Sequence, residues 1–349
     1  MKALVTGATG LLGAHIARAL VADGHQVRAL VRANSNRDSL VDSPVEFIIG
    51  DLQTGDLASA CHDCDAVFHA AAHFAYTGVT TTTMRDTAVA GTERLLRAAA
   101  SAGVPRVVIT SSSVVFGYAT SATLIGETET LASEMGESPY VSSKLAQHHR
   151  AAELADTLHL DIRFACPTMT LGPSNSRLGP SNGLIAAYLS DPFRCTFPGG
   201  CNLVSARDVA RGHLLIALHG DAGESYLLGS ENLTWRQIHT AIAHLAGVPP
   251  PANQLTHSLA WFAATADEIR AALTHRTALS TREQAAMIGR YYWYSHAKAA
   301  TLGYAPAPAR AALIETIAWL SASPHISRET RINMHLAPDI YRFRAGAAA

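Results

Sequence analysis

Short runs of apolar residues alternate along the chain with longer segments in which apolar residues recur every three or four positions. Lys2–Thr6, Gln26–Val31 and Val45–Ile49 are runs of strand length that are apolar almost throughout, whereas Leu11–Ala22 has the spacing of a helix. The alternation continues to a last strand-like run at residues 160–165. Strands that are apolar on both faces and joined by helices predict a parallel sheet with helices on both sides. We therefore expect an α/β fold with a doubly wound sheet in this half of the chain.

The pattern loosens beyond residue 166. Residues 172–183 are rich in Gly, Pro, Ser and Asn, which is typical of a long loop. Two segments of helical spacing, 234–246 and 309–320, follow. The last segment holds four arginines without clear periodicity, so a lid, an oligomer arm and a disordered end all remain open. We divide the chain into residues 1–165, a smaller α/β portion at 166–323 with some strands returning to the main sheet, and a C-terminal tail at 324–349.

The composition excludes several classes of protein. Of the 349 residues, 48% are apolar and only 16% are charged, which is enough apolar material for a large core and argues against disorder. The net charge of −1 and a pI near 7.0 give no electrostatic signal for nucleic acid or an anionic membrane. No apolar run approaches the roughly 18 residues of a membrane span, and the N-terminus lacks a signal-peptide pattern. Five cysteines form an odd number without a disulfide framework, so we expect a cytoplasmic protein.

The first chemical motif lies where the first predicted strand meets the first predicted helix. Glycines there allow a tight turn, so that backbone N–H groups and the helix N-terminus can approach a pyrophosphate. A glycine-rich turn that binds nothing is the alternative, but the strand before it and the helix after it favour a dinucleotide site. The residues that we expect to contact the dinucleotide here are Thr6, Gly7, Thr9, Gly10, Leu11, Leu12 and Gly13.

The end of the second predicted strand bears on the choice of dinucleotide. An acidic side chain at this point would accept hydrogen bonds from an adenosine ribose 2′-hydroxyl, whereas an arginine suits a 2′-phosphate. Here the strand is followed by Arg32, which favours NADP(H) over NAD(H), although a solvated loop arginine would give the same pattern. Asp51, at the end of the third strand, is well placed for the adenine amino group.

A second motif places a tyrosine and a lysine four residues apart. Tyr140 and Lys144 lie one above the other on the face of a predicted helix. A nearby ammonium favours phenolate, which lowers the tyrosine pKa from about 10 and makes Tyr140 a usable general acid or base. This spacing often occurs by chance, but here it follows the dinucleotide motif and a strand ending in Thr110, Ser111 and Ser112, which offers a hydroxyl to the reacting oxygen.

Together these motifs resemble those of the extended short-chain dehydrogenases/reductases, in the NAD-dependent epimerase/dehydratase group. The resemblance rests on residues 6–13, 51–52, 67–71, 91–92, 111–117 and the Tyr140/Lys144 pair, and it runs to about residue 320. Within the group the chain is most similar to dihydroflavonol-reductase-like and hopanoid-associated sugar-epimerase-like proteins. The resemblance implies a Rossmann-like domain that binds NADP, a second portion that covers the substrate, and a homodimer built through the helices that include Tyr140.

The resemblance also implies roles for individual residues. Ser112 would polarise the substrate oxygen, Tyr140 would transfer the proton, and Lys144 would hold the nicotinamide ribose and tune Tyr140. The remaining residues that it places at the cofactor are Leu52, Ala70, Ala71, Ala72, Thr110, Ser111, Pro167 and Thr168.

Three positions depart from the family pattern. Ala88 stands where the family usually has an asparagine that supports the surroundings of the catalytic lysine, which puts a complete proton relay in doubt. No acidic pair follows Ser112, so the dehydration carried out by one branch of the family is disfavoured. After Arg163, a Gly-Pro pair comes later than in the nucleotide-sugar epimerases, at a spacing similar to that of the reductase branch.

The substrate surface can be predicted only coarsely. Several aromatic and aliphatic side chains fall in loops expected to face the nicotinamide, which suits an apolar carbonyl compound better than a charged nucleotide sugar. The same residues are also typical of a plain core. The candidates for substrate contact are His73, Phe74, Ser113, Met169 and Phe193. The candidates for binding a phosphate instead are Arg177, Arg194 and Arg207.

Three functions from different classes remain open. The leading hypothesis is an NADPH-dependent reductase of small apolar ketones or aldehydes, with no nucleic-acid partner. A sugar epimerase would oxidise and re-reduce a tightly held substrate, and a dinucleotide sensor would bind the cofactor without catalysis. Cys61 and Cys64 are separated by two residues, but no second ligand pair matches them, so we expect helix-end packing and no metal.

Overall fold

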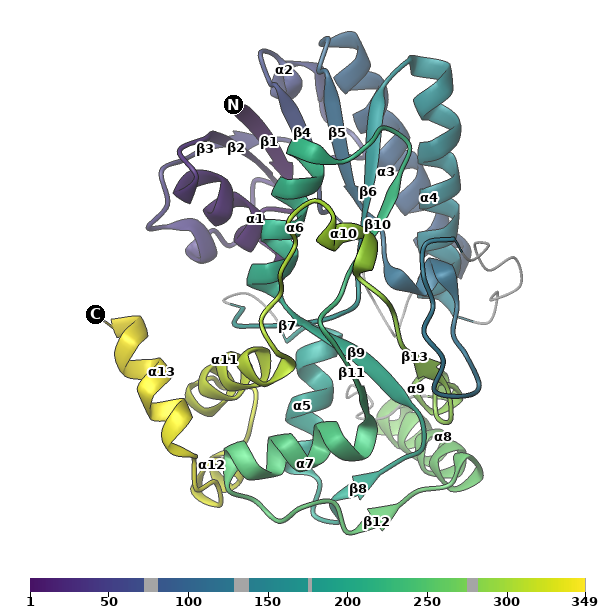
Figure 1. Ribbon diagram of the computed structural model, residues 1–349, viewed down its shortest axis with the longest axis vertical. Coiled ribbons are helices and arrows are strands. Elements are labelled where there is room, and N and C mark those ends of the chain that lie inside the picture. The colour runs from purple at the N-terminus through teal and green to yellow at the C-terminus, as the bar shows by residue number, and fades with distance from the viewer. Residues whose placement is uncertain (72–80, 129–137, 175–177, 275–281, 349) are drawn as a thin grey trace.

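The computed structural model describes the chain except for residues 72–80, 129–137, 175–177, 275–281 and 349 (Figure 1). Its larger part is built on a seven-stranded sheet in the order β10-β6-β5-β4-β1-β2-β3, and every neighbouring pair is parallel. The strand order reverses between β1 and β4, as in a doubly wound fold, so this prediction is confirmed. The strands are β1 (Lys2–Thr6), β2 (Gln26–Val31), β3 (Val45–Ile49), β4 (Ala66–His69), β5 (Arg106–Thr110), β6 (Asp161–Pro167) and β10 (Ser225–Leu228).

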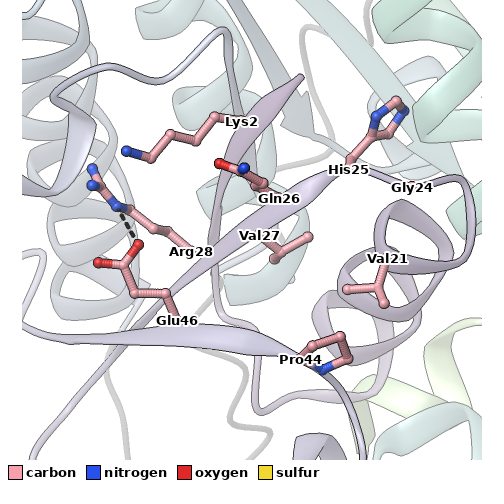
Figure 2. Close-up of a pocket in the computed structure, with 9 residues that line it drawn as sticks. All are labelled: Lys2, Val21, Gly24, His25, Gln26, Val27, Arg28, Pro44 and Glu46. Carbon is pink, nitrogen blue, oxygen red and sulfur yellow. Dashed lines mark hydrogen bonds and ion pairs between the residues drawn. The ribbon is translucent and has the colours of Figure 1, made fainter.

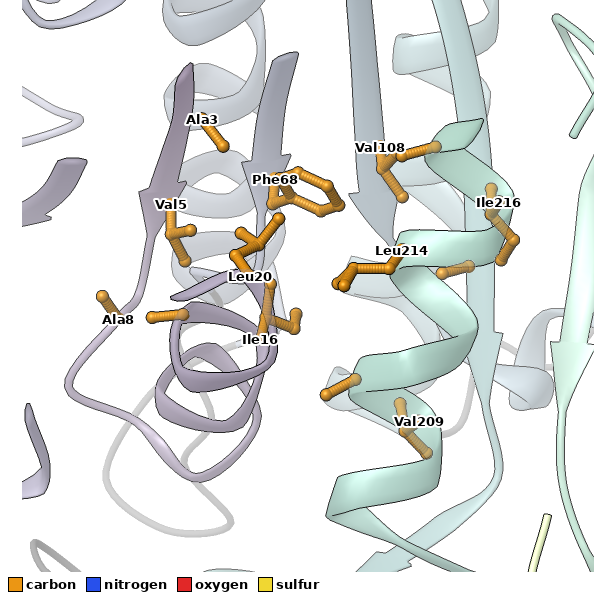
Figure 3. Close-up of a cluster of buried hydrophobic side chains, with 14 of the residues drawn as sticks. Ala3, Val5, Ala8, Ile16, Leu20, Phe68, Val108, Val209, Leu214 and Ile216 are labelled. Carbon is orange, nitrogen blue, oxygen red and sulfur yellow. The ribbon is translucent and has the colours of Figure 1, made fainter. Parts of the chain in front are cut away.

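Both faces of this sheet are buried, because its strands carry apolar residues at successive positions. In β1, Ala3 and Val5 belong to the core on one face and Leu4 to the core on the other. Figure 3 shows the first of these faces, where Leu20 and Leu214 pack from α1 and α6 against the strands. Helices α2, α3 and α4 cover the opposite face. The helices and 3₁₀ turns of this part are α1 (Leu11–Ala22), η1 (Asp38–Leu40), α2 (Ala58–Cys61), α3 (Thr81–Ser101), η2 (Ser113–Phe116), α4 (Pro139–Leu158), α6 (Ala206–His219) and α10 (Ala297–Ala300).

A smaller part lies beyond the carboxyl ends of β6 and β10 (Figure 1). Its sheet has four strands, in which β9 pairs with β7, β11 and β13, and a separate two-stranded ladder joins β8 to β12. Helices α5, α7 and α11 enclose an apolar core against the larger of these sheets. The strands are β7 (Met169–Leu171), β8 (Cys195–Thr196), β9 (Gly200–Ser205), β11 (Glu231–Thr234), β12 (Asn253–Gln254) and β13 (Tyr291–Tyr292). The helices are α5 (Pro180–Ser190), α7 (Trp235–Ala246), α8 (His257–Thr274), α9 (Arg282–Ala286), α11 (Ala309–Ala322), α12 (Arg328–Ile332) and α13 (Pro338–Ala348).

The described residues of the C-terminal tail, up to 348, pack on the smaller part. Its second helix, α13, packs on α11 and buries Ile340 completely. Arg344 donates to the carbonyl oxygen of Ala318 at 3.1 Å, and Arg310 of α11 pairs with Asp339. In the part of the chain that the structure describes, no helix combines the length and apolar character that a membrane crossing needs.

The chain passes repeatedly between the two parts. Thr168 alone separates β6 from β7, β9 runs directly into α6, and β10 returns the chain to the main sheet. Asn202 of β9 is fully buried at this junction. Its side-chain oxygen accepts a hydrogen bond from the Thr168 hydroxyl at 2.8 Å, and its amide nitrogen donates to the Asn232 side chain at 2.8 Å. A network of neutral hydrogen bonds therefore fixes the point where the two sheets meet.

Candidate active site

The glycine loop between β1 and α1 forms a tight cradle that a side chain would fill. Gly7 has a left-handed φ of +68°, and a Cβ there would lie 2.6 Å from the Ala71 backbone nitrogen. A Cβ on Gly13 would lie 2.2 Å from the Gly7 carbonyl oxygen. Gly10 is the N-cap of α1, and no side chain caps the first turn. The backbone N–H groups of that turn are therefore available to an anionic ligand, which fits the pyrophosphate of a dinucleotide.

Two arginines lie after β2, where the adenosine end of such a dinucleotide would sit. Arg32 is exposed, and it forms no ion pair with any described residue. The guanidinium of Arg37 lies 5.1 Å from the centre of the Phe47 ring on β3. Asp51 follows β3, and its carboxylate accepts a hydrogen bond from the Gln53 backbone at 2.8 Å. Two guanidinium groups thus lie where the adenosine ribose would sit, and the Asp51 carboxylate follows the neighbouring strand, β3.

Ser112, Tyr140 and Lys144 come together beyond the carboxyl end of β5. Ser112 follows β5 by two residues and is the N-cap of η2. Ser138 caps α4 and Pro139 occupies its first turn, so the helix begins one residue before Tyr140. The hydroxyls of Ser112 and Tyr140 are joined by a hydrogen bond. The structure thus brings together the three residues that the sequence singled out for catalysis.

Lys144 lies one turn further along α4 and is almost completely buried. Its ammonium donates to the Thr110 carbonyl oxygen and to the Gln147 side-chain oxygen, each at 2.9 Å. Burial lowers the pKa of Lys144 to about 8, because the charged form is poorly solvated. The side chain is therefore mostly protonated near pH 7 and titrates just above it.

The expected lowering of the tyrosine pKa by the lysine is wrong for this structure. Burial raises the pKa of Tyr140, and only its hydrogen bond with Ser112 acts in the opposite direction. The ammonium of Lys144 donates to Thr110 and Gln147, and the causes of the shift in the pKa of Tyr140 are burial and Ser112. Tyr140 is therefore a phenol at neutral pH, which is the state that a proton donor needs.

Two other predicted cofactor residues engage buried histidines through their side chains. The Thr110 hydroxyl lies 2.9 Å from His213 Nε2, and the Ser111 hydroxyl lies 2.9 Å from His148 Nδ1. Burial lowers the pKa of both histidines to about 4, so both are neutral near pH 7. The histidines fix the end of β5 from two sides.

The remaining predicted cofactor residues lie at the same edge of the sheet. Ala70 and Ala71 follow β4. The Ala70 backbone nitrogen donates to the Thr6 carbonyl oxygen at 3.2 Å, and the Ala71 backbone nitrogen donates to the Thr6 hydroxyl at 3.4 Å. Leu52 follows β3, Pro167 ends β6, and Thr168 comes directly after it. Ala72 lies outside the described residues, as do the substrate candidates His73 and Phe74.

The other substrate candidates are scattered. Ser113 is buried in η2 and forms a hydrogen bond with the Tyr294 hydroxyl. Met169 lies in β7 and packs against the core of the smaller part. Phe193 is 71% exposed in the turn between α5 and β8, and its carbonyl oxygen accepts a hydrogen bond from Asn253 of β12. Figure 1 shows the β8–β12 ladder at the end of the smaller part that lies away from the main sheet. The structure therefore does not bring Phe193 to Ser113 or Met169.

Two of the three arginines considered for a phosphate are already engaged. Arg194 donates to the carbonyl oxygens of Tyr188 and Leu189 at 2.7 and 3.1 Å, at the end of α5. Arg207 pairs with Glu315 at 3.2 Å. Arg177 lies outside the described residues.

Sequence reasoning missed a polar cluster behind Lys144. Gln147, Thr92 and His69 are buried side chains joined by hydrogen bonds, and Gln147 contacts Lys144 directly. The available signal was the spacing of three residues between Lys144 and Gln147, which places both on one face of α4. The partners on α3 and β4 are far away in the sequence and gave no such signal.

The cysteine pair is packed at the end of α2, as expected from the sequence. Cys61 and Cys64 are both buried, and the Cys64 thiol donates to the Ala60 carbonyl oxygen at 3.6 Å. Burial raises the pKa of Cys61 to about 12, so its thiol is unreactive near neutral pH.

A surface pocket of about 460 Å³ opens at the opposite, amino-terminal edge of the sheet. Figure 2 shows Lys2, Gln26 and Arg28 around it, with Arg28 donating to Glu46 at 2.9 Å. The glycine loop and the Ser112–Tyr140–Lys144 group both lie at the carboxyl edge. Ligands of open α/β sheets bind at that edge, near the reversal of strand order, so we place the active site there.

A family model described as the NAD dependent epimerase/dehydratase family matches residues 3–229. The match includes the glycine loop, the Tyr140/Lys144 pair and every strand of the main sheet. The chain belongs to the NAD dependent epimerase/dehydratase family. The resemblance stated from the motifs is thereby confirmed.

Relatives of this family member include proteins named as a reductase and as an epimerase. One relative, from Synechocystis sp. (strain ATCC 27184 / PCC 6803 / Kazusa), has the provisional name dihydroflavonol 4-reductase. The two sequences are 30% identical over 330 residues, and the match covers 93% of this chain and 96% of the relative. The crystal structure of gox2253 matches 93% of this chain and 99% of its own, with a TM-score of 0.81 and 32% identity. The structure of PA4631, a nucleoside-diphosphate-sugar epimerase from Pseudomonas aeruginosa, matches 94% of this chain and 99% of its own, with a TM-score of 0.76 and 26% identity. The family and these relatives indicate an oxidoreductase or epimerase of the short-chain dehydrogenase/reductase class.

Proposed function

We propose that the protein is an NADPH-dependent reductase of ketones or aldehydes. The observation that carries the proposal is the hydrogen bond between Ser112 and Tyr140 at the carboxyl edge of the sheet. Two hydroxyls in contact can both donate to a single substrate oxygen, one as a polarising group and one as the proton source. The raised pKa of Tyr140 keeps its proton in place until that oxygen becomes basic.

The chain's own residues account for the acid–base half of the reaction. Bound at the glycine loop, the nicotinamide cofactor would supply the hydride to the carbonyl carbon. Ser112 donates a hydrogen bond to the carbonyl oxygen, and Tyr140 transfers its proton as negative charge develops there. The Lys144 ammonium, held one helical turn away by Thr110 and Gln147, would donate to the nicotinamide ribose of the bound cofactor.

Arg32 supports NADPH over NADH. It is exposed directly after β2 and has no carboxylate partner among the described residues, so its charge is available to a ribose 2′-phosphate. Arg37 adds a second positive charge close by, stacked on Phe47. A phosphate is recognised best where such guanidinium donors are free to turn towards it.

An uncharged, apolar substrate is supported by the other two described arginine candidates, because both already bind groups of the protein. Arg194 caps the end of α5 and Arg207 pairs with Glu315, so neither is poised for the diphosphate of a nucleotide sugar. The likeness to PA4631, a nucleoside-diphosphate-sugar epimerase, nevertheless makes sugar epimerisation the second candidate. An epimerase would oxidise and re-reduce the same substrate and consume no cofactor overall.

NADPH consumption by the purified protein tests the proposal. We expect turnover with members of a panel of apolar ketones and aldehydes, and a loss of about 100- to 10,000-fold in Tyr140→Phe with NADPH affinity nearly unchanged. Tyr341→Phe removes the same hydroxyl from an exposed position on α13 and should be silent.

Two outcomes would argue against a reductase. NADPH binding without consumption of any carbonyl compound would favour epimerisation, which incubation with nucleotide sugars and NMR of the products would then detect. Binding with neither activity would leave the dinucleotide sensor. Turnover that survives in Tyr140→Phe would remove Tyr140 from the proposed mechanism.

The family resemblance also supports a homodimer that pairs through α3 and α4. These helices pack against each other on one face of the sheet, and Arg150 of α4 pairs with Glu93 of α3 at 2.9 Å. Light scattering measures the mass of the purified protein in solution, and we expect twice the chain mass of 36.9 kDa.

A further inference from the structure

Lys144 is buried among groups that carry no charge. It is only 5% exposed, and it has no carboxylate partner in the described chain. The titratable groups that face it, besides Tyr140, are His69 at the end of β4, His148 on its own helix and Cys166 on β6. Burial lowers the pKa of the two histidines to about 3 and 4 and raises that of the Cys166 thiol to about 12. All three are neutral near pH 7, so only neutral acceptors support the ammonium.

Two such acceptors hold it. The Thr110 carbonyl oxygen and the Gln147 side-chain oxygen each lie 2.9 Å from Nζ. Gln147 is three residues after Lys144 on the same face of α4 and is 2% exposed. An ammonium can only donate, so the carboxamide must turn its oxygen to Lys144 and its nitrogen away from it. The orientation of Gln147 is therefore set by the charge that it supports.

The carboxamide nitrogen continues the contact towards the glycine loop. Gln147 Nε2 donates to the Thr92 hydroxyl on α3 at 2.8 Å, and this hydroxyl lies 3.0 Å from His69 Nε2. His69 Nδ1 lies 2.8 Å from the Thr6 hydroxyl at the end of β1. With His69 neutral and its proton on Nδ1, Thr92 donates to His69 and His69 donates to Thr6. Each hydrogen bond is then donated in the same direction, from Lys144 to Thr6, which directly precedes the glycine loop.

We propose that Gln147 is a positioning residue that holds the Lys144 ammonium and couples it, through Thr92 and His69, to the glycine loop. This inference rests on the proposed function for the role of Lys144 in the reaction. Each side chain in the line is buried, so water cannot readily replace a lost partner. The line also crosses four elements: α4 and α3, which pack on the sheet through apolar side chains, and the paired strands β4 and β1.

The lysine content of the chain allows a direct test. There are only three lysines, Lys2, Lys144 and Lys298, so lysine labelled with ¹³C at the ε carbon gives three NMR signals whose pH titration can be followed. Lys144→Met identifies the signal of interest. Gln147→Met removes the carboxamide at similar size, and Gln147→Glu keeps the acceptor and adds a negative charge. Gln254→Met makes the same change on exposed β12 and is the matched control.

Opposite shifts are the expected result. Gln147→Met should lower the pKa of Lys144 by about one unit, because the charged form loses an acceptor, and Gln147→Glu should raise it by about one unit or more. Gln254→Met should leave it unchanged. A residue that only fills space would not move the pKa in opposite directions in the two variants. A Lys144 pKa within about 0.2 units of wild type in Gln147→Glu would overturn the proposal.

Two further measurements keep the test decisive. If Gln147→Met does not fold, Thr92→Val replaces it, and the loss of the hydroxyl that fixes the carboxamide should lower the pKa of Lys144 by a smaller amount. The NMR titration needs no substrate, so it does not depend on the proposed reaction. If the Lys144 pKa shifts as expected while the pH profile of NADPH consumption stays in place, the positioning of Lys144 by Gln147 is supported and the role of Lys144 in reduction is refuted. If the two move together, both are supported.

Discussion

Gly13→Ala tests whether the close contact between α1 and the glycine loop shapes the cofactor site. A Cβ at this position would lie 2.2 Å from the Gly7 carbonyl oxygen, 2.6 Å from the Gly7 carbonyl carbon and 3.0 Å from the Ala8 Cα. Contacts between non-bonded heavy atoms are favourable only at about 3.5 Å, so α1 would have to move by about 1 Å. All three atoms belong to the backbone, and no side chain can rotate away to make room.

The displacement should weaken both folding and cofactor binding. Forcing a methyl group into a packed contact costs about 1–3 kcal/mol of unfolding free energy. A shift of about 1 Å also misplaces the N–H groups of the first turn of α1, for which we expect a loss of about 100-fold in NADPH affinity. Urea unfolding measures the first quantity, and titration of NADPH fluorescence measures the second.

Two other glycines provide a graded comparison. A Cβ on Gly10 would meet only the Gly7 carbonyl oxygen, at 3.3 Å, so Gly10→Ala should have a much smaller effect than Gly13→Ala. Gly183 lies in α5 with open space around its Cβ position, and Gly183→Ala should stabilise the protein by about 0.5–1 kcal/mol. Wild-type NADPH affinity and stability in Gly13→Ala would refute the reasoning from this contact.

Three further outcomes follow from other parts of the structure. Arg32→Glu should reverse the cofactor preference, raising kcat/KM for NADH relative to NADPH by about 100-fold; an unchanged ratio would show that Arg32 does not face the 2′-phosphate. The pKa of His213 is about 4 in the folded state and near 6.5 when exposed, so the unfolded state binds the proton first and the stabilisation, complete above about pH 6.5, is lost as the pH falls towards 4. The decrease in unfolding free energy between pH 7 and pH 5, measured by chemical unfolding, should therefore be about 2 kcal/mol smaller in His213→Gln than in wild type. Equal decreases would contradict the lowered pKa of His213. Tyr294→Phe removes the hydroxyl that donates to the Gly117 carbonyl oxygen at 2.6 Å, and should lower the unfolding free energy by about 1–3 kcal/mol, whereas a silent variant would mean that another donor takes over.

The main sheet was predictable because its strands are buried on both sides. β1 and β2 begin and end where the apolar runs do, since nearly every position in them faces one core or the other, and β3 follows its run as a partly exposed edge strand paired with β2. The first half of α3 was not predictable from helix propensity. It is rich in threonine and contains Gly91, so packing of residues such as Met84 stabilises it instead.

The site was predictable wherever its chemistry is local in the sequence. The glycine loop and the Tyr140/Lys144 pair each lie within one turn or one loop, so spacing was enough to find them. The pKa of Tyr140 was not predictable, because it depends on how deeply the phenol is buried and on where the Lys144 ammonium turns. The doubt raised by Ala88 concerned support for Lys144, and in the structure Gln147 contacts that ammonium from α4, the helix of Lys144 itself.

Thr168, the single residue between β6 and β7, makes the two parts of the molecule mechanically inseparable. A linker of one residue leaves no room for a hinge, and the later returns of the chain through α6 and β10 would each have to break for the parts to come apart. Proteolysis or truncation near this point should therefore give no autonomous fragment, and the chain should melt as one cooperative unit. A cofactor bound at the glycine loop would then slow amide hydrogen exchange even in α13, a helix that makes no contact with the cofactor.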